Sequence, residues 1–151
     1  MMFMILTGST AFSQILAFTG ATKGLVELAV GFDLSPLYLI VAMQGLILVL
    51  GTFMEPVSIM MVTFPIFMPL VNALNFDPVW FGLMALINIQ IGMTTPPFGL
   101  CLFVMKGVTP PNTSMMDIYK SILPFILIDL FAMLLILIFP SIALFLPDFM
   151  R

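Results

Sequence analysis

Five long runs without a single charged residue dominate this sequence and limit what the chain can fold into. The runs are Met1–Thr22, Leu34–Met54, Pro56–Phe76, Pro78–Met105 and Leu130–Pro147. Each approaches or exceeds the roughly 20 apolar residues that a helix needs to cross the hydrocarbon core of a bilayer. Only 7% of the 151 residues are charged, whereas soluble domains carry about 25%. The sequence therefore predicts an all-α integral membrane protein that is surrounded largely by lipid.

The composition excludes several classes of function. The chain has no histidine, so histidine-based catalytic triads and histidine metal sites are excluded. Its single cysteine, Cys101, cannot form a disulfide within the chain, and we interpret it as a small apolar core residue. The four Lys and Arg residues are scattered and form no basic patch for nucleic acid. We therefore predict no enzyme, no catalytic residue, no organic cofactor and no nucleic-acid partner.

Charged residues, prolines and glycines divide the chain into segments of a single membrane unit. Ser35-Pro36 and Asp77-Pro78 are typical helix starts, because proline fits the first helical position after a capping side chain. Ser114 and Asp117 have the spacing of a capping box at another helix start. Within residues 1–151 we predict a transmembrane helix at 1–22, an interfacial helix at 25–33, a helical hairpin at 35–74, a broken helix at 78–105 and a terminal transmembrane helix at 115–146.

The turn of the hairpin allows two interpretations. The segment Gly51–Ser58 carries one charge, Glu55, among Phe, Met and Val residues. It is either an aqueous loop between two spans or the tip of a re-entrant hairpin inside the membrane, and we favour the tip because the turn is so apolar. Glu55 either serves a functional site, as acids inside membranes usually do, or caps the helix that starts at Pro56. The two roles are compatible.

The broken helix contains the sequence QIGMTTPPFG, residues 90–99, in which we predict a break from Gly92 to Gly99. Pro96 and Pro97 lack backbone N–H groups, and two threonines and two glycines flank them. The interruption is either a simple proline kink or an ion-binding loop. We favour the loop, because a pair of proline- and glycine-interrupted segments is typical of the binding sites of secondary transporters. In such sites unwound carbonyls coordinate cations and helix N-termini face anions.

At these interruptions the sequence resembles the large permease subunit of the tripartite ATP-independent periplasmic (TRAP) transporters, of the DctM type. The similarity lies in the C-terminal portion of that subunit, which fits a chain that begins inside an apolar helix and is far shorter than the family's subunit. The residues that carry the resemblance are Gly51, Phe53, Met54-Glu55-Pro56, Pro65-Ile66, Pro69-Leu70, Asp77-Pro78, Trp80-Phe81-Gly82, Ile91-Gly92, Thr95-Pro96-Pro97, Gly99, Leu102-Phe103-Val104 and Lys106-Gly107.

This resemblance implies a fold and a function. The fold would be part of an ion-transporter-superfamily-like elevator fold, in which a re-entrant helical hairpin and a broken transmembrane helix meet. The function would be Na⁺-driven import of organic acids, such as C4-dicarboxylates or sialic acid, across the bacterial inner membrane by a multi-pass permease. The implied partners are a small TRAP membrane subunit and a periplasmic substrate-binding protein. The alternative is a membrane scaffold or interaction fragment that does not transport.

The resemblance also implies which residues form the site. Gln90 stands where many members of the family carry an acid, so we assign no charge role to that position. Carbonyl and hydroxyl oxygens suit a hard cation. For the carboxylate substrate the implied residues are Glu55, Pro56, Ser58, Thr94, Thr95, Pro96 and Pro97. For Na⁺ they are Gly51, Thr52, Gly92, Thr94, Thr95 and Pro96.

Overall fold

A computed structural model describes residues 2–21, 24, 26–27, 31, 35–96 and 98–149 of the chain. Within these ranges the protein is all-helical and contains no strand. Most of the predicted interfacial helix at 25–33 lies outside the described residues. The helices are α1 (Met2–Thr19), α3 (Pro36–Gly51), α4 (Pro56–Ala73), α5 (Pro78–Thr94), α6 (Leu100–Val108), α7 (Met115–Ile138) and α8 (Pro140–Phe149).

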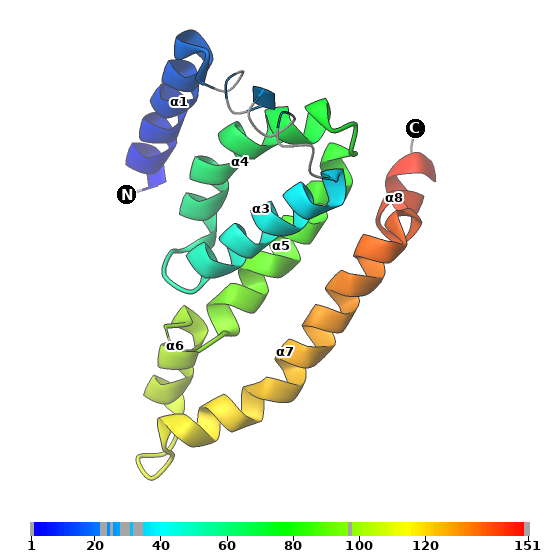
Figure 1. Cartoon of the computed structure of the whole chain (residues 1–151). Helices are drawn as coiled ribbons and strands as arrows, with labels where there is room; N and C mark the ends of the chain where they lie inside the picture. The colour runs from blue at the N-terminus through cyan, green and yellow to red at the C-terminus, as the bar shows by residue number, and fades with distance from the viewer. Residues whose placement is uncertain are drawn as a thin grey trace.

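The core lies where α3, α4 and α5 pack together (Figure 1). The most extensive packing is between α3 and α5, and α4 packs against both. Helix α1 lies against α4, while α7 runs beside α5. The largest fully buried side chains of this core are Phe81, Ile40, Ile47, Ile59 and Met84. The hairpin and the first half of the broken helix therefore form the best-packed part of the molecule.

Capping side chains start the helices as the sequence predicted, with one difference. The carboxylate of Asp77 accepts hydrogen bonds from the backbone N–H groups of Val79 (2.7 Å) and Trp80 (3.2 Å) at the start of α5. Ser114 and Asp117 form the predicted capping box of α7. Ser35 occupies the cap position of α3, but its side chain makes no capping hydrogen bond. There, Pro36 at the first helical position provides the start signal.

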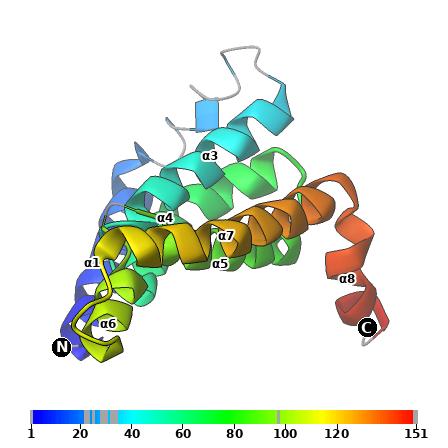
Figure 2. The ribbon, with the colours of Figure 1, turned by 90° about the horizontal axis from the view of Figure 1, so that it is seen from below.

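The prediction of one terminal helix over residues 115–146 is wrong. Helix α7 ends at Ile138, and α8 begins at Pro140 and turns away from the line of α7 (Figure 2). Phe139 has φ −119° and ψ 76°, because a proline pushes the preceding residue out of helical geometry. Pro140 also lacks the N–H that would bond to the carbonyl of Ile136. That carbonyl instead accepts a hydrogen bond from the indole Nε1 of Trp80 in α5, at 2.9 Å.

Among the described residues, two helices are long and apolar enough to cross a membrane, namely α4 and α7. Helices α3 and α5 are shorter apolar helices, as is the Phe3–Leu16 part of α1, which lies inside the predicted span 1–22. In α7 the only buried residue is Ile118, and large apolar side chains along the helix are exposed. Such a surface is what a bilayer or other apolar helices would cover.

Candidate functional site

The two predicted interruptions meet in space. Helix α3 ends at Gly51, where its backbone lies directly against Gly92 near the end of α5. A Cβ atom placed on Gly92 would lie 2.7 Å from the Cα of Gly51 and 2.9 Å from the carbonyl oxygen of Leu48. Beyond this contact the rings of Phe53 and Phe98 lie 5.2 Å apart between their centroids. The turn between α3 and α4 therefore lies beside the break between α5 and α6 (Figure 1).

The hairpin tip comprises the turn between Gly51 and Pro56. The hydroxyl of Thr52, which is buried, donates to the carbonyl of Val49 at 2.8 Å. The half-buried Glu55 is the cap of α4: its Oε1 accepts from the backbone N–H (3.0 Å) and the hydroxyl (2.7 Å) of Ser58. The capping role considered for Glu55 is thus confirmed, and it leaves a carboxylate at the tip.

The broken-helix loop is shorter than the sequence suggested. The interruption was expected from Gly92, but α5 continues to Thr94 and α6 begins at Leu100. Inside the loop the N–H of Gly99 donates to the carbonyl of Thr95 at 3.2 Å. A Cβ atom on Gly99 would lie 2.5 Å from the carbonyl oxygen of Met93, so only glycine fits without a shift of backbone. Pro97 lies outside the described residues.

The threonines of the loop point their hydroxyl protons back into α5. Thr95 donates to the carbonyl of Ile91 at 2.6 Å, and Thr94 lies 3.0 Å from the same carbonyl and 3.2 Å from that of Gln90. A hydroxyl that donates its proton still has lone pairs on its oxygen. These half-buried oxygens can therefore still accept a hydrogen bond. In the part of the chain that the structure describes, no three His, Cys, Asp or Glu residues cluster as a metal site.

A buried pair of amides lies between the same two helices. Asn88 in α5 donates from Nδ2 to the backbone carbonyl of Gln44 in α3, and to the Oε1 of Gln44 at 3.1 Å. Asn88 is 1% exposed and Gln44 is 3% exposed. Asn88 is a polar residue in an otherwise apolar stretch of the sequence, but neither it nor Gln44 was predicted as a site residue. The signal that could have found Gln44 is the same: a lone amide in an apolar segment.

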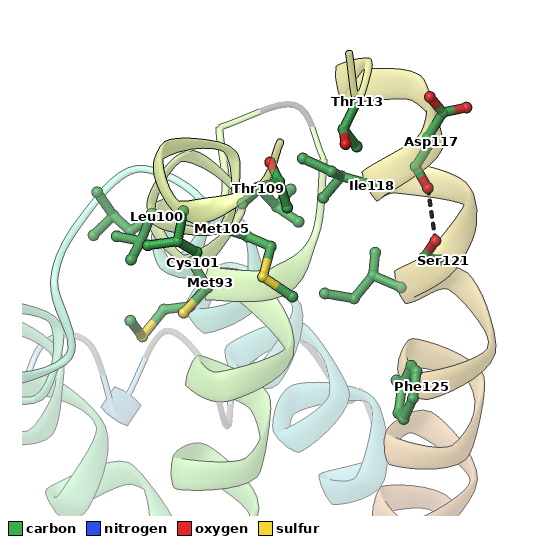
Figure 3. A pocket seen from close by; sticks show the side chains of 14 residues that line it. Met93, Leu100, Cys101, Met105, Thr109, Thr113, Asp117, Ile118, Ser121 and Phe125 are labelled. Atoms are coloured by element: carbon green, nitrogen blue, oxygen red, sulfur yellow. Dashed lines mark hydrogen bonds between the residues drawn. The ribbon is translucent and has the colours of Figure 1, made fainter. Parts of the chain in front are cut away.

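A separate cavity lies between α6 and α7 (Figure 3). It has a volume of about 560 Å³, and its walls are mostly apolar. Cys101, interpreted as a core residue, is half-buried and lines this cavity. Asp117 and Ser121 stand at its α7 side, where the hydroxyl of Ser121 donates to the backbone carbonyl of Asp117 at 2.8 Å. With so few polar groups, this cavity does not suit a carboxylate substrate.

Comparison with known proteins places the chain in a family. Residues 1–142 match the family described as the tripartite ATP-independent periplasmic transporter, DctM component. The chain belongs to this family. It is 34% identical over 148 residues to the C4-dicarboxylate TRAP transporter large permease protein DctM of Rhodobacter capsulatus, covering 98% of this chain and 33% of that protein.

Other relatives in the family have different named substrates. The sialic acid TRAP transporter large permease protein SiaM of Vibrio cholerae is 34% identical, over 96% of this chain and 34% of that protein. The ectoine TRAP transporter large permease protein TeaC of Halomonas elongata is 31% identical, over 97% of this chain and 34% of that protein. The chain thus spans about a third of the length of these relatives. The predicted resemblance is confirmed, and these relatives are permeases rather than enzymes.

Proposed function

We propose that this TRAP-family chain supplies one half of the transport site of a Na⁺-driven, binding-protein-dependent importer of organic acids in the bacterial inner membrane. One observation carries the proposal: the ends of α3 and α5 pack against each other through Gly51 and Gly92, which brings the hairpin tip beside the broken-helix loop. A kink that served only to bend a helix would need no such partner. Interrupted helices at membrane depth are tolerated where protein or a water-filled cavity surrounds them.

The cation is proposed to bind among oxygens of the two interruptions. In this proposal Na⁺ takes carbonyl oxygens together with the hydroxyl oxygens of the threonines, all of which are hard ligands. The buried Thr52 and half-buried Thr95 are the hydroxyls on the two sides. The negative charge of Glu55 at the tip favours a cation nearby. The full proposed set is Gly51, Thr52, Gly92, Thr94, Thr95 and Pro96.

The carboxylate of the substrate is proposed to lie nearer to α6 than to α4. The N-terminus of a helix attracts anions through its free N–H groups and its dipole. At α4 the positive N-terminal end of the helix is already neutralised by the carboxylate of Glu55. At α6 the cap residue is Gly99, which provides no side-chain hydrogen bond. The anion would therefore face the start of α6. Thr94 and Thr95 would bind it by turning their hydroxyl protons from the carbonyls of α5 towards the carboxylate. Pro56 and Ser58 would line the opposite side, with Pro96 and Pro97 beside the anion.

The substrate class and the partners follow from the family and stay proposals for this chain. Relatives are named for C4-dicarboxylate, sialic acid, isethionate and ectoine, so similarity alone does not select one substrate. An organic acid of the C4-dicarboxylate or sialic-acid type fits the open start of α6. We propose a small TRAP membrane subunit and a periplasmic substrate-binding protein as partners. The small subunit is either separate or fused.

The proposal is tested by removing one hydroxyl from each interruption. The permease that contains this chain would be reconstituted into liposomes with its small subunit and binding protein, as Thr52→Ala and as Thr95→Ala. We expect each variant to need about tenfold more Na⁺ for half-maximal uptake, because a lost ligand costs ~1–2 kcal/mol. Thr10→Ala is the matched control, since that exposed hydroxyl also bonds to the carbonyl four residues before it. Unchanged Na⁺ dependence in both site variants would refute the assignment.

A further inference from the structure

We propose that Gln44 and Asn88 form an amide clamp that fixes the register of α3 against α5 and so holds the hairpin tip against the broken-helix loop. The inference rests on the proposed function, in which the two interruptions form one site. It adds the positioning residues that bring the two halves of that site together. The term amide clamp is used below for this pair of side chains alone.

The position of the amide clamp suits this role. Asn88 lies four residues before Gly92 in α5, and Gln44 lies seven residues before Gly51 in α3. At a rise of 1.5 Å per residue, Asn88 is roughly 6 Å along the helix axis from the glycine contact. Both helices approach their interruptions in the same direction, so the clamp and the glycine contact lie along one interface. A slide of either helix at the clamp would therefore move Gly51 away from Gly92.

The hydrogen bonds of the clamp are specific to one register. A single amide nitrogen of Asn88 reaches both the main-chain carbonyl and the side-chain Oε1 of Gln44. The main-chain acceptor ties the side chain of one helix to the backbone of the other. The neighbouring core residues Ile47 and Ile89 are aliphatic. Aliphatic contacts are non-directional and tolerate small shifts, whereas a hydrogen bond weakens steeply when its geometry is lost.

The amide clamp lowers the stability of the fold. A pair of residues that served only to pack the core would not be expected to do so. Gln44 Nε2 and Asn88 Oδ1 are buried and have no hydrogen-bond partner among the described residues. An unsatisfied buried polar group costs free energy, whereas apolar groups of the same shape are often neutral or stabilising. Buried polar groups that do not maximise stability can instead specify the register of two helices. The unpaired atoms are therefore better explained by positioning than by stability.

The test replaces both amides by apolar side chains of similar size. In the double variant Gln44→Met/Asn88→Leu, we expect the permease to fold with an unchanged or higher melting temperature. Phe53→Cys and Phe98→Cys would be introduced together, in a background without other cysteines, and joined by a short bifunctional thiol reagent. We expect the double variant to cross-link about tenfold more slowly, within the range of coupling between residues in contact. The Na⁺ concentration for half-maximal uptake should rise, while the maximal rate changes less.

Two further variants make the result decisive. Gln14→Met removes an exposed amide on α1 and should leave the cross-linking rate and the Na⁺ dependence unchanged. The exchanged pair Gln44→Asn/Asn88→Gln keeps two amides across the interface and should restore most of the cross-linking. A folded apolar double variant that cross-links at the wild-type rate would overturn the clamp. Because cross-linking does not depend on uptake, loss of cross-linking supports the clamp even in a permease that proves not to be driven by Na⁺.

Discussion

Two proline breaks interrupt helices in the described part of this molecule, and they differ in what lies against them. The break between α5 and α6 is packed against the hairpin tip through Gly92 and Phe98. The break between α7 and α8 occurs at Phe139, which is exposed and is followed by the exposed Pro140. At the second break the freed carbonyl of Ile136 is satisfied by a single indole N–H. A proline break thus becomes a candidate site only where a second interruption covers it.

The prolines within helices sharpen the comparison. Pro65 and Pro69 lie inside α4 and Pro124 lies inside α7, yet none of them ends its helix. A proline alone therefore does not locate a break in this chain. At the α5–α6 loop the additional feature is Gly99, whose position leaves no room for a Cβ atom between it and the backbone of Met93. Two close glycine approaches, rather than proline alone, distinguish the candidate site.

The largest expected effect comes from filling the glycine contact. In Gly92→Ala the new methyl group would overlap the backbone of Gly51, and backbone cannot move aside as a flexible side chain can. We expect a loss of ~2–3 kcal/mol in stability, as for overpacked cores, together with loss of Na⁺-driven uptake. Thermal unfolding in detergent and liposome uptake measure the two effects. Gly82→Ala, where a Cβ atom meets nothing within 4 Å, is the control and should be neutral or slightly stabilising.

Wild-type stability in Gly92→Ala would mean that α3 and α5 lie further apart than the structure shows.

An intermediate effect is expected from the acid at the hairpin tip. Glu55→Ala removes the cap of α4 and should cost ~1 kcal/mol. Asp77→Ala removes the equivalent cap of α5 at the helix end away from the breaks, and should cost about the same ~1 kcal/mol. If Glu55 also serves the site, only Glu55→Ala lowers uptake beyond the loss of folded protein. Thermal unfolding and uptake per folded permease separate the roles, and equal uptake in both variants would leave Glu55 as a cap alone.

The smallest effect is expected at the break that lies against no second interruption. Pro140→Ala restores a backbone N–H that can reach the carbonyl of Ile136 and lets α7 continue into α8. We expect stability to change by less than ~0.5 kcal/mol, as for most exposed substitutions, and uptake to stay at the wild-type level. Helix content by circular dichroism should rise slightly. A fall in uptake as large as that of Gly92→Ala would show that the two breaks are functionally alike.

Local signals in the sequence predicted where helices start. They did not predict which residues of different helices contact each other. Asp77 and the pair Ser114 and Asp117 cap their helices as expected, because a cap depends only on residues a few positions apart. The two interruptions were also visible, as prolines and glycines in apolar runs. The register that places Gly51 on Gly92 was not visible, because it depends on residues far apart in the chain.

The end of α7 was mispredicted although a local signal marks it. Pro140 is a local signal, but the surrounding apolar run suggested a continuous helix to residue 146. A break in an apolar helix is tolerated where another group satisfies the freed carbonyl. That group is the indole of Trp80, which lies 56 positions away in the chain. From the sequence alone, Pro140, at which α7 ends, could not be distinguished from Pro124, which lies inside α7 without ending it.

The bond between Trp80 and the carbonyl of Ile136 has a practical consequence. Trp80 is the single tryptophan of this chain and is 3% exposed. Its ring stacks on that of Phe76, with centroids 5.4 Å apart. Indole emission depends on the polarity around the ring, so the chain carries an intrinsic optical probe at the junction of α5 with the end of α7. A rearrangement of α7 relative to the core would then shift the emission maximum of Trp80, without any added label.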